Sequence, residues 1–222
     1  MGGLIPLGDA SRRPARVPVV TALIILINVL VFLMELTRGD AFVLEWAAIP
    51  AQILSGHRWI TIFTAMFMHG SWSHIIGNMI FLWAFSPEIE DAMGRLRYLV
   101  FYLAGGVAAM LAQILANSSS TIPNLGASGA IAAVMGAFLV TYPRDRIKAI
   151  LFIFIFVRIT FIPASLIIGF WFLTQLVDAG AVARVETGGV AYLAHIGGFI
   201  FGAATARLFE DPRRIAQQTS DD

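Results

Sequence analysis

The sequence predicts an all-α membrane protein, a bundle of six transmembrane helices with both termini on the cytoplasmic side. Of the 222 residues, 58% are hydrophobic, whereas soluble domains usually have about 45–50%. The mean hydropathy is +0.80 and only 13% of residues are charged. We expect residues 1–18 to form a cytoplasmic N-terminal segment, residues 19–208 the six-helix domain, and residues 209–222 a cytoplasmic tail.

Six segments have the length and apolar character that a helix needs to cross a bilayer, which takes about 20 residues. Four are clear: residues 19–36, 98–116, 126–142 and 190–208. Two are weaker. The helix through "HIIGNMIFLWAF" is apolar only in its second half, and "PASLIIGFWFLTQLV", residues 163–177, is short.

Two further apolar stretches are not expected to span. "WITIFTAMFM" is too short, so residues 37–69 are interpreted as a long outer loop, partly embedded between the first two helices. "IKAILFIFIFVRITFI" is interrupted by Arg158 and is rich in β-branched and aromatic residues. It is expected to be strand-like or to lie in the membrane interface.

The basic residues predict the orientation, because short cytoplasmic loops carry an excess of Lys and Arg. With six crossings and a cytoplasmic N-terminus, 12 of the 15 Lys and Arg residues fall inside. The three outside are Arg38, Arg58 and Arg184. A seventh crossing near residue 151 would put the C-terminal arginines outside, so the charges favour six.

Polar residues lie near the outer starts of the second, fourth and sixth predicted helices. His74 lies in the stretch "HGSWSHIIGN", Ser128 opens the fourth helix, and His195 is about five residues into the sixth. Asn78 follows His74 by four residues and so lies on the same helical face, one turn deeper. Such groups are tolerated at membrane depth only inside protein or beside a water-filled cavity.

Small residues would allow the fourth and sixth helices to touch. Ser128, Ala132 and Gly136 follow each other at four-residue spacing, and Gly198 and Gly202 form a GxxxG pair. Small residues at this spacing permit close backbone approach in lipid. If these faces pack together, Ser128 and His195 become neighbours.

A serine beside a histidine suggests nucleophilic catalysis. The hydroxyl attacks a carbonyl only when a base takes its proton, which a histidine can do near neutral pH. The resulting oxyanion needs preorganised donors. The side chains of His74 and Asn78 and the backbone N–H of Ser128 are candidates. The chain has no cysteine, which excludes a disulfide, a thiol nucleophile and a thiolate metal site.

Three motifs, "HGSWSHIIGN", "GASGAIAAVMGA" and "AHIGGFIFG", occur in this order on the second, fourth and sixth helices. Together with the charge pattern they resemble the rhomboid family of intramembrane serine proteases, over residues of about 19–208. The resemblance implies a Ser128–His195 dyad without an acidic third member, and His74 and Asn78 as oxyanion donors. It also implies structural roles near the site for Gly126, Gly129, His69, Gly198 and Gly202.

The resemblance further implies a multi-pass membrane protein that cleaves transmembrane segments of membrane proteins near their outer end. We expect transmembrane protein substrates and the lipid bilayer as partners, and no cofactor, metal or nucleic acid. The expected location is the inner membrane of a bacterium. The loop 178–190 is expected to be a lid and the fifth helix a lateral gate, so that a cross-link from Trp171 or Phe172 to the second helix would slow cleavage.

Two alternatives stay open. One is a catalytically inactive rhomboid-like protein that binds membrane clients. The other is a metal or transport site built from His69, His74 and His195, although no HExxH motif occurs.

The sequence departs from the family pattern at Ala132, where some relatives carry a tyrosine that stacks on the catalytic histidine. Such stacking must come from elsewhere or be absent.

Overall fold

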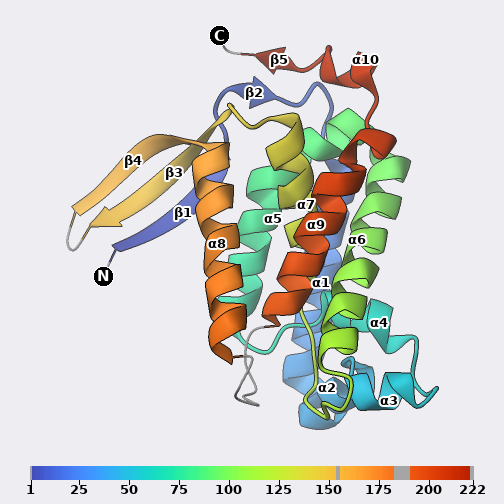
Figure 1. Cartoon of the computed structure of the whole chain (residues 1–222). Helices are drawn as coiled ribbons and strands as arrows, with labels where there is room; N and C mark the ends of the chain where they lie inside the picture. Colours follow the sequence, from blue (N-terminus) through green and yellow to red (C-terminus); the bar gives the residue numbers. More distant parts are fainter. Residues whose placement is uncertain (1, 154–155, 183–190, 221–222) are drawn as a thin grey trace.

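Six long helices run side by side in the computed structural model, which describes residues 2–153, 156–182 and 191–220 (Figure 1). They are α1 (Val19–Arg38), α5 (Trp72–Met93), α6 (Arg95–Ala116), α7 (Ser128–Thr141), α8 (Ala164–Val182) and α9 (Tyr192–Phe209). Each corresponds to one of the six apolar segments of the sequence.

Short helices mark the two ends of this bundle. One end carries α2 (Asp40–Trp46), α3 (Pro50–Leu54), α4 (Thr61–Thr64) and the 3-10 helix η1 (Ala65–Phe67). The opposite end carries α10 (Pro212–Ile215) (Figure 1). We call them the α2–α4 end and the α10 end.

Among the described residues, three helices are long and apolar enough to span a membrane. They are α1, α6 and residues Ala164–Ala181 of α8. Helix α7 is apolar but has only 14 residues. Helix α5 carries polar side chains along its length, which include the buried residues Asn78, Glu88 and Asp91.

Helix α7 lies at the centre of the bundle and packs closely against α9. All its residues from Gly129 to Phe138 are buried. A Cβ atom on Gly136 would overlap the Phe199 carbonyl oxygen, and one on Gly202 would overlap the Ala133 carbonyl oxygen. Only glycine allows this backbone approach. The contact fixes α7 and α9 relative to each other.

A three-stranded antiparallel sheet corrects the all-α prediction. Its order is β1 (Gly2–Asp9), β3 (Arg146–Ile153), β4 (Phe156–Pro163). The stretch between α7 and α8 is too short to span and rich in strand-forming side chains, so it folds into β3 and β4. Strand β1 was not expected, because "GGLIPLGD" is rich in Gly and contains Pro.

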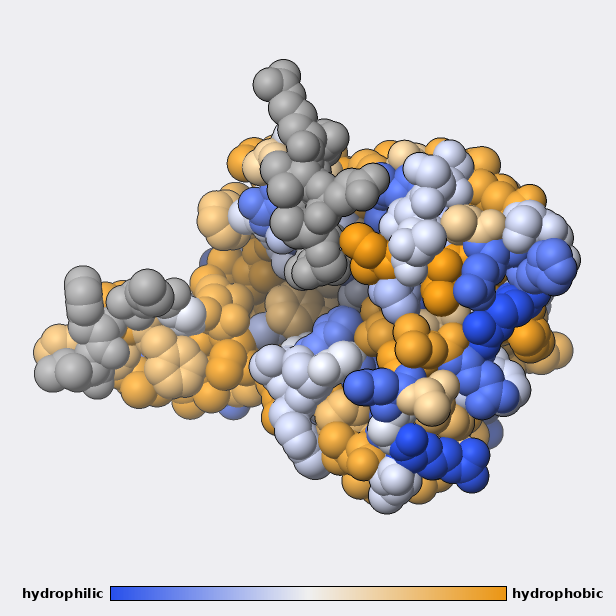
Figure 2. Space-filling model, turned by 90° about the horizontal axis from the view of Figure 1, so that it is seen from below, coloured by the Kyte–Doolittle hydropathy of each residue, from blue (hydrophilic) through white to orange (hydrophobic). Residues whose placement is uncertain are grey.

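The sheet extends sideways from the bundle as an apolar arm (Figures 1 and 2). Strand β4 is its outer edge, and the side chains of Phe156, Val157 and Ile159 are exposed there. Strand β1 forms the other edge and lies against α5. The two remaining strands, β2 (Arg12–Arg13) and β5 (Thr219–Ser220), pair with each other at the α10 end.

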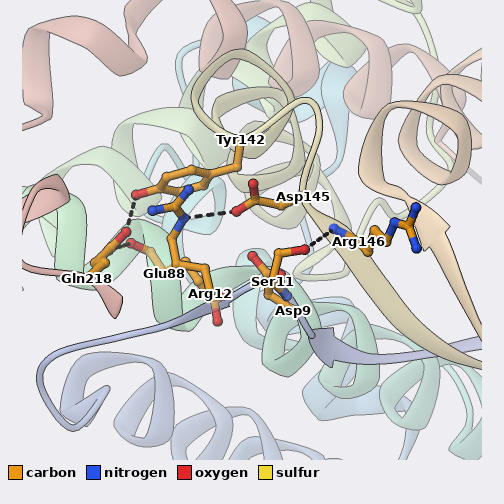
Figure 3. A network of polar contacts seen from close by, with 8 residues as sticks. All are labelled: Asp9, Ser11, Arg12, Glu88, Tyr142, Asp145, Arg146 and Gln218. Atoms are coloured by element: carbon orange, nitrogen blue, oxygen red, sulfur yellow. Dashed lines mark hydrogen bonds and ion pairs between the residues drawn. The ribbon is translucent and has the colours of Figure 1, made fainter. Parts of the chain in front are cut away.

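Polar contacts at the α10 end join both terminal segments to the helices (Figure 3). Arg12 Nε lies 2.9 Å from Asp145 Oδ2, and its guanidinium stacks over the Tyr142 ring at 4.7 Å. The Tyr142 hydroxyl donates to Gln218 Oε1 (2.6 Å), and the Gln218 amide donates to the Glu88 carbonyl oxygen (2.8 Å). The N-terminal segment, α5, the end of α7 and the C-terminal segment are thereby held together.

Candidate active site

Ser128 and His195 meet at the α2–α4 end of the bundle. Ser128 is the first residue of α7 and His195 lies in the first turn of α9. His195 Nε2 is 2.7 Å from Ser128 Oγ. The close packing of α7 on α9 brings them together, as the spacing of small residues predicted.

Gly126 shapes the turn that leads into Ser128. Its φ of +133° is a conformation that favours glycine, and its N–H donates to the Ala65 carbonyl oxygen at 2.8 Å. A Cβ atom here would lie 3.0 Å from His74 Nε2 and 3.5 Å from Ser128 Oγ. The His74 ring and the Ser128 hydroxyl therefore flank Gly126, and a Cβ atom would crowd the His74 ring while only touching the Ser128 hydroxyl.

The other glycines expected near the site act in packing. A Cβ atom on Gly129 would lie 2.6 Å from the Ala109 Cβ. One on Gly198 would overlap the Gly129 carbonyl oxygen. Both positions hold α9 and α6 against the first turn of α7. The orientation of His195 toward Ser128 thus depends on their lack of a side chain.

Candidate hydrogen-bond donors for the site lie at the starts of α5 and α7. His74 and Asn78 occupy the first two turns of α5, whose start is capped by Ser71 Oγ accepting from the His74 N–H at 3.2 Å. Asn78 is buried, and its Nδ2 has no hydrogen-bond partner in the described part of the chain. The Ser128 N–H belongs to the first turn of α7, where N–H groups have no intrahelical acceptor.

His69 contacts α1 rather than Ser128. Its backbone N–H donates to both carboxylate oxygens of Glu35, each at 3.1 Å. Its ring is buried and lies edge-on to the His74 ring, with centroids 5.1 Å apart. Sequence reasoning missed Glu35, although an acidic residue near the end of an apolar helix signals a specific partner.

Two residues of α8 contact the His195 ring, and neither contact was anticipated. Gln175 Oε1 is 2.6 Å from His195 Nδ1, and the Trp171 ring centroid is 5.7 Å from that of His195. Trp171 thus supplies the aromatic neighbour that Ala132 cannot. The signal for Gln175 was a lone amide in an apolar segment, one helical turn after Trp171.

The expected lateral gate needs one correction. Trp171 and Phe172 were expected to be suitable for a cross-link to the second helix, α5. Instead, Trp171 lies beside His195, and the Phe172 ring stacks on Phe199 of α9 with centroids 4.2 Å apart. Both side chains face α9 because α8 packs mainly on that helix. Residues 183–190 of the expected lid lie outside the described residues.

A metal site built from His69, His74 and His195 has no support in the geometry. Within residues 2–153, 156–182 and 191–220, no group of three or more His, Asp or Glu side chains is arranged to hold a metal ion. Both ring nitrogens of His195 are engaged, one by Ser128 and the other by Gln175.

The fold and the site together define a class of protein. It is an apolar helical bundle in which a serine hydroxyl lies against a histidine ring near one end. The chain belongs to the rhomboid family, and the model of the rhomboid domain matches residues 56–211. It is an integral membrane protein.

Several relatives support this membership. The chain is 28% identical over 183 residues to Rhomboid protein 1, mitochondrial, of Saccharomyces cerevisiae, covering 79% of this chain and 49% of the relative. It is 30% identical over 145 residues to the human presenilin-associated rhomboid-like protein, mitochondrial, covering 61% and 34%. It is 29% identical over 133 residues to the Rhomboid protease GluP of Bacillus subtilis, covering 58% and 26%.

The chain therefore spans about half or less of the length of these relatives. Most of the relatives are named as mitochondrial proteins, so the comparisons do not support the expected location in a bacterial inner membrane.

Proposed function

We propose that the chain is an intramembrane serine endopeptidase that cleaves transmembrane segments of membrane proteins near their outer end. The observation that carries the proposal is the 2.7 Å contact between His195 Nε2 and Ser128 Oγ, at one end of an apolar bundle. Membership of a family that includes a named protease supports it.

In the proposed reaction, the Ser128 hydroxyl attacks the scissile carbonyl while His195 Nε2 takes its proton. The carbonyl oxygen becomes an oxyanion, which accepts hydrogen bonds from the Ser128 N–H, the Asn78 amide and the His74 ring. The protonated His195 then gives its proton to the leaving amine, and an acyl-enzyme forms on Ser128. Water, activated by His195, releases the acyl group by the reverse sequence of steps.

The free Nδ2 of Asn78 supports the oxyanion role. A buried N–H without an acceptor is unfavourable, at a cost of about 1–3 kcal/mol. Asn78 is buried and its Nδ2 has no partner in the described part of the chain. An oxyanion that forms only during the reaction would satisfy this donor in the transition state, which is the requirement for catalysis.

The orientation is also part of the proposal: six crossings, with the α10 end in the cytoplasm. Basic residues concentrate at the α10 end: before α1, at the start of α6, after α7, in the last turn of α9 and after it. They are Arg12, Arg13, Arg16, Arg95, Arg97, Arg144, Arg146, Lys148, Arg207, Arg213 and Arg214. This distribution favours the α10 end as the cytoplasmic side. Ser128 then lies below the outer surface.

The alternative is an inactive rhomboid-like protein that binds membrane clients. It predicts that Ser128 is no more reactive than an ordinary serine hydroxyl. A fluorophosphonate probe in detergent micelles tests this directly. Wild type should be labelled at Ser128, with labelling lost in His195→Ala and unaffected by a chelator. Labelling that is absent in folded wild type, or that persists in His195→Ala, would favour the client-binding alternative.

A further inference from the structure

We infer that Gln175 is a positioning residue that sets the tautomer and orientation of His195; the inference rests on the proposed function. His195 must accept the Ser128 proton at Nε2, so in its neutral form Nδ1 must carry the hydrogen. Gln175 Oε1 lies 2.6 Å from that Nδ1 and is suited to accept this N–H. Gln175 is buried, with 7% of its surface exposed, and comes from a different helix.

The amide of Gln175 has only one orientation that satisfies its surroundings. Gln175 Nε2 lies 3.1 Å from Thr174 Oγ1 and 3.3 Å from the Trp171 carbonyl oxygen. The carbonyl oxygen can only accept, so the NH₂ group must face it. A flipped amide would set its own oxygen against that carbonyl. The amide oxygen therefore faces His195.

Thr174 reinforces this polarity. Its Oγ1 lies 2.6 Å from the Trp171 carbonyl oxygen, so its hydroxyl hydrogen is donated there. The Thr174 oxygen keeps lone pairs that can accept from the Gln175 NH₂ group.

One carbonyl group thus sets the direction of a chain of hydrogen bonds. The Thr174 hydroxyl and the Gln175 NH₂ donate toward Trp171, the His195 Nδ1–H donates to Gln175, and the Ser128 hydroxyl donates to His195. In this order the Nε2 lone pair points at the proton that must be removed. Gln175 occupies the position relative to the histidine that a carboxylate has in a Ser–His–Asp triad, but without a charge.

The test compares three variants with wild type. Gln175→Leu removes the acceptor while keeping the side-chain size. Gln175→Glu keeps an oxygen for the Nδ1–H. Gln113→Leu is the matched control, because Gln113 Oε1 accepts from the Ala194 backbone N–H (3.3 Å) beside His195 but does not contact its ring.

The first measurement is the tautomer of His195 by nitrogen NMR of protein labelled at its four histidines. The signal is assigned through its loss in His195→Ala. Wild type and Gln113→Leu should show neutral His195 with hydrogen on Nδ1 and none on Nε2. Gln175→Leu should show a mixture of tautomers. Wild-type protein with hydrogen on Nε2, or an unchanged spectrum in Gln175→Leu, would overturn the inference. This result does not depend on any proteolysis.

The second measurement is turnover of a membrane-anchored substrate. Gln175→Leu should lower kcat by about 10–100-fold with KM changed less than about twofold, since positioning acts on the chemical step. Gln175→Glu should recover most of that loss, and Gln113→Leu should stay within about twofold of wild type. If Gln175→Leu keeps full kcat while Ser128→Ala is inactive, the inference fails and the proposed function stands. If wild type cleaves nothing, the proposed function fails while the NMR result still decides the role of Gln175.

Discussion

The roles of Asn78 and His74 decide whether the start of α5 acts in catalysis or only in packing. Asn78→Ala should lower kcat by about 10²–10³-fold, the usual effect of losing an oxyanion donor, with little change in KM. Asn28→Ala is the matched control, because the buried Asn28 Nδ2 already donates within its own helix α1, to the Ile24 carbonyl oxygen. The control should lower thermal stability and keep kcat. Full kcat in folded Asn78→Ala would remove Asn78 from the oxyanion site.

Residue roles could be predicted from sequence only where a partner is implied by the residue itself. Ser128 and His195 have complementary chemistry, and the small residues around each predicted the contact. Gln175 could not be assigned, because its partner depends on the rotation of α8 about its axis, which an almost uniformly apolar helix does not reveal. Glu35 accepts from a backbone N–H, and sequence does not indicate which backbone group a carboxylate will reach.

At the scale of elements, the glycines between α7 and α9 should decide whether the site forms. Gly202→Ala places a Cβ atom against the Ala133 carbonyl oxygen, so the two helices must move apart. We expect a loss of stability of about 1–3 kcal/mol, as for other overpacked cores, together with lower activity. Gly169→Ala in α8 is the control, because nothing lies within 4 Å of its Cβ position. Thermal unfolding in detergent measures the stability of both variants. Equal stability of Gly202→Ala and Gly169→Ala would contradict the close packing of α7 on α9.

Helix α8 is the element whose movement is expected to admit substrate. Phe172 and Phe199 stack across α8 and α9, and the chain has no natural cysteine. We therefore propose to replace both by cysteine and bridge them with a short thiol-reactive linker. The bridge should slow cleavage of a transmembrane substrate but leave labelling of Ser128 by a small probe unchanged. Cleavage at the unbridged rate would show that α8 need not move away from α9.

The strands show where sequence reasoning at this scale reaches its limit. The β-branched and aromatic run of β3 and β4 indicated either a strand or an interfacial segment. Strand β1 has poor intrinsic strand propensity, and it forms because it pairs with β3, far away in the chain. Pairing between distant segments is a tertiary effect that no local pattern predicts.

At the scale of the whole molecule, the contacts at the α10 end should make stability depend on pH through Asp9. Burial, and to a lesser extent the neighbouring Asp145, raise the pKa of Asp9 to about 7, whereas an N–H bond from Ser11 acts in the opposite direction. The ordinary pKa of an aspartate is about 3.9. The stabilisation that protonated Asp9 contributes is therefore complete below about pH 4 and is lost as pH rises through about 7.

Asp9→Asn cannot ionise and keeps an oxygen that can accept the Ser11 N–H. The stability that Asp9→Asn gains over wild type should be larger at pH 8.5 than at pH 5. Thermal unfolding of both proteins across this range measures the difference, which cancels the titration of other groups. A difference that does not change with pH would contradict a raised pKa for Asp9.

The central claim is that Ser128 and His195 cut a polypeptide within the membrane. The most direct measurement reconstitutes wild type, Ser128→Ala and His195→Ala in lipid vesicles with a panel of membrane-anchored substrates, followed by mass spectrometry of the products. The account predicts that wild type produces fragments that end within a transmembrane segment near its outer end. Both variants should produce none, although thermal unfolding shows that they are folded. Cleavage that continues in Ser128→Ala, or fragments that end only outside the transmembrane segment, would contradict it.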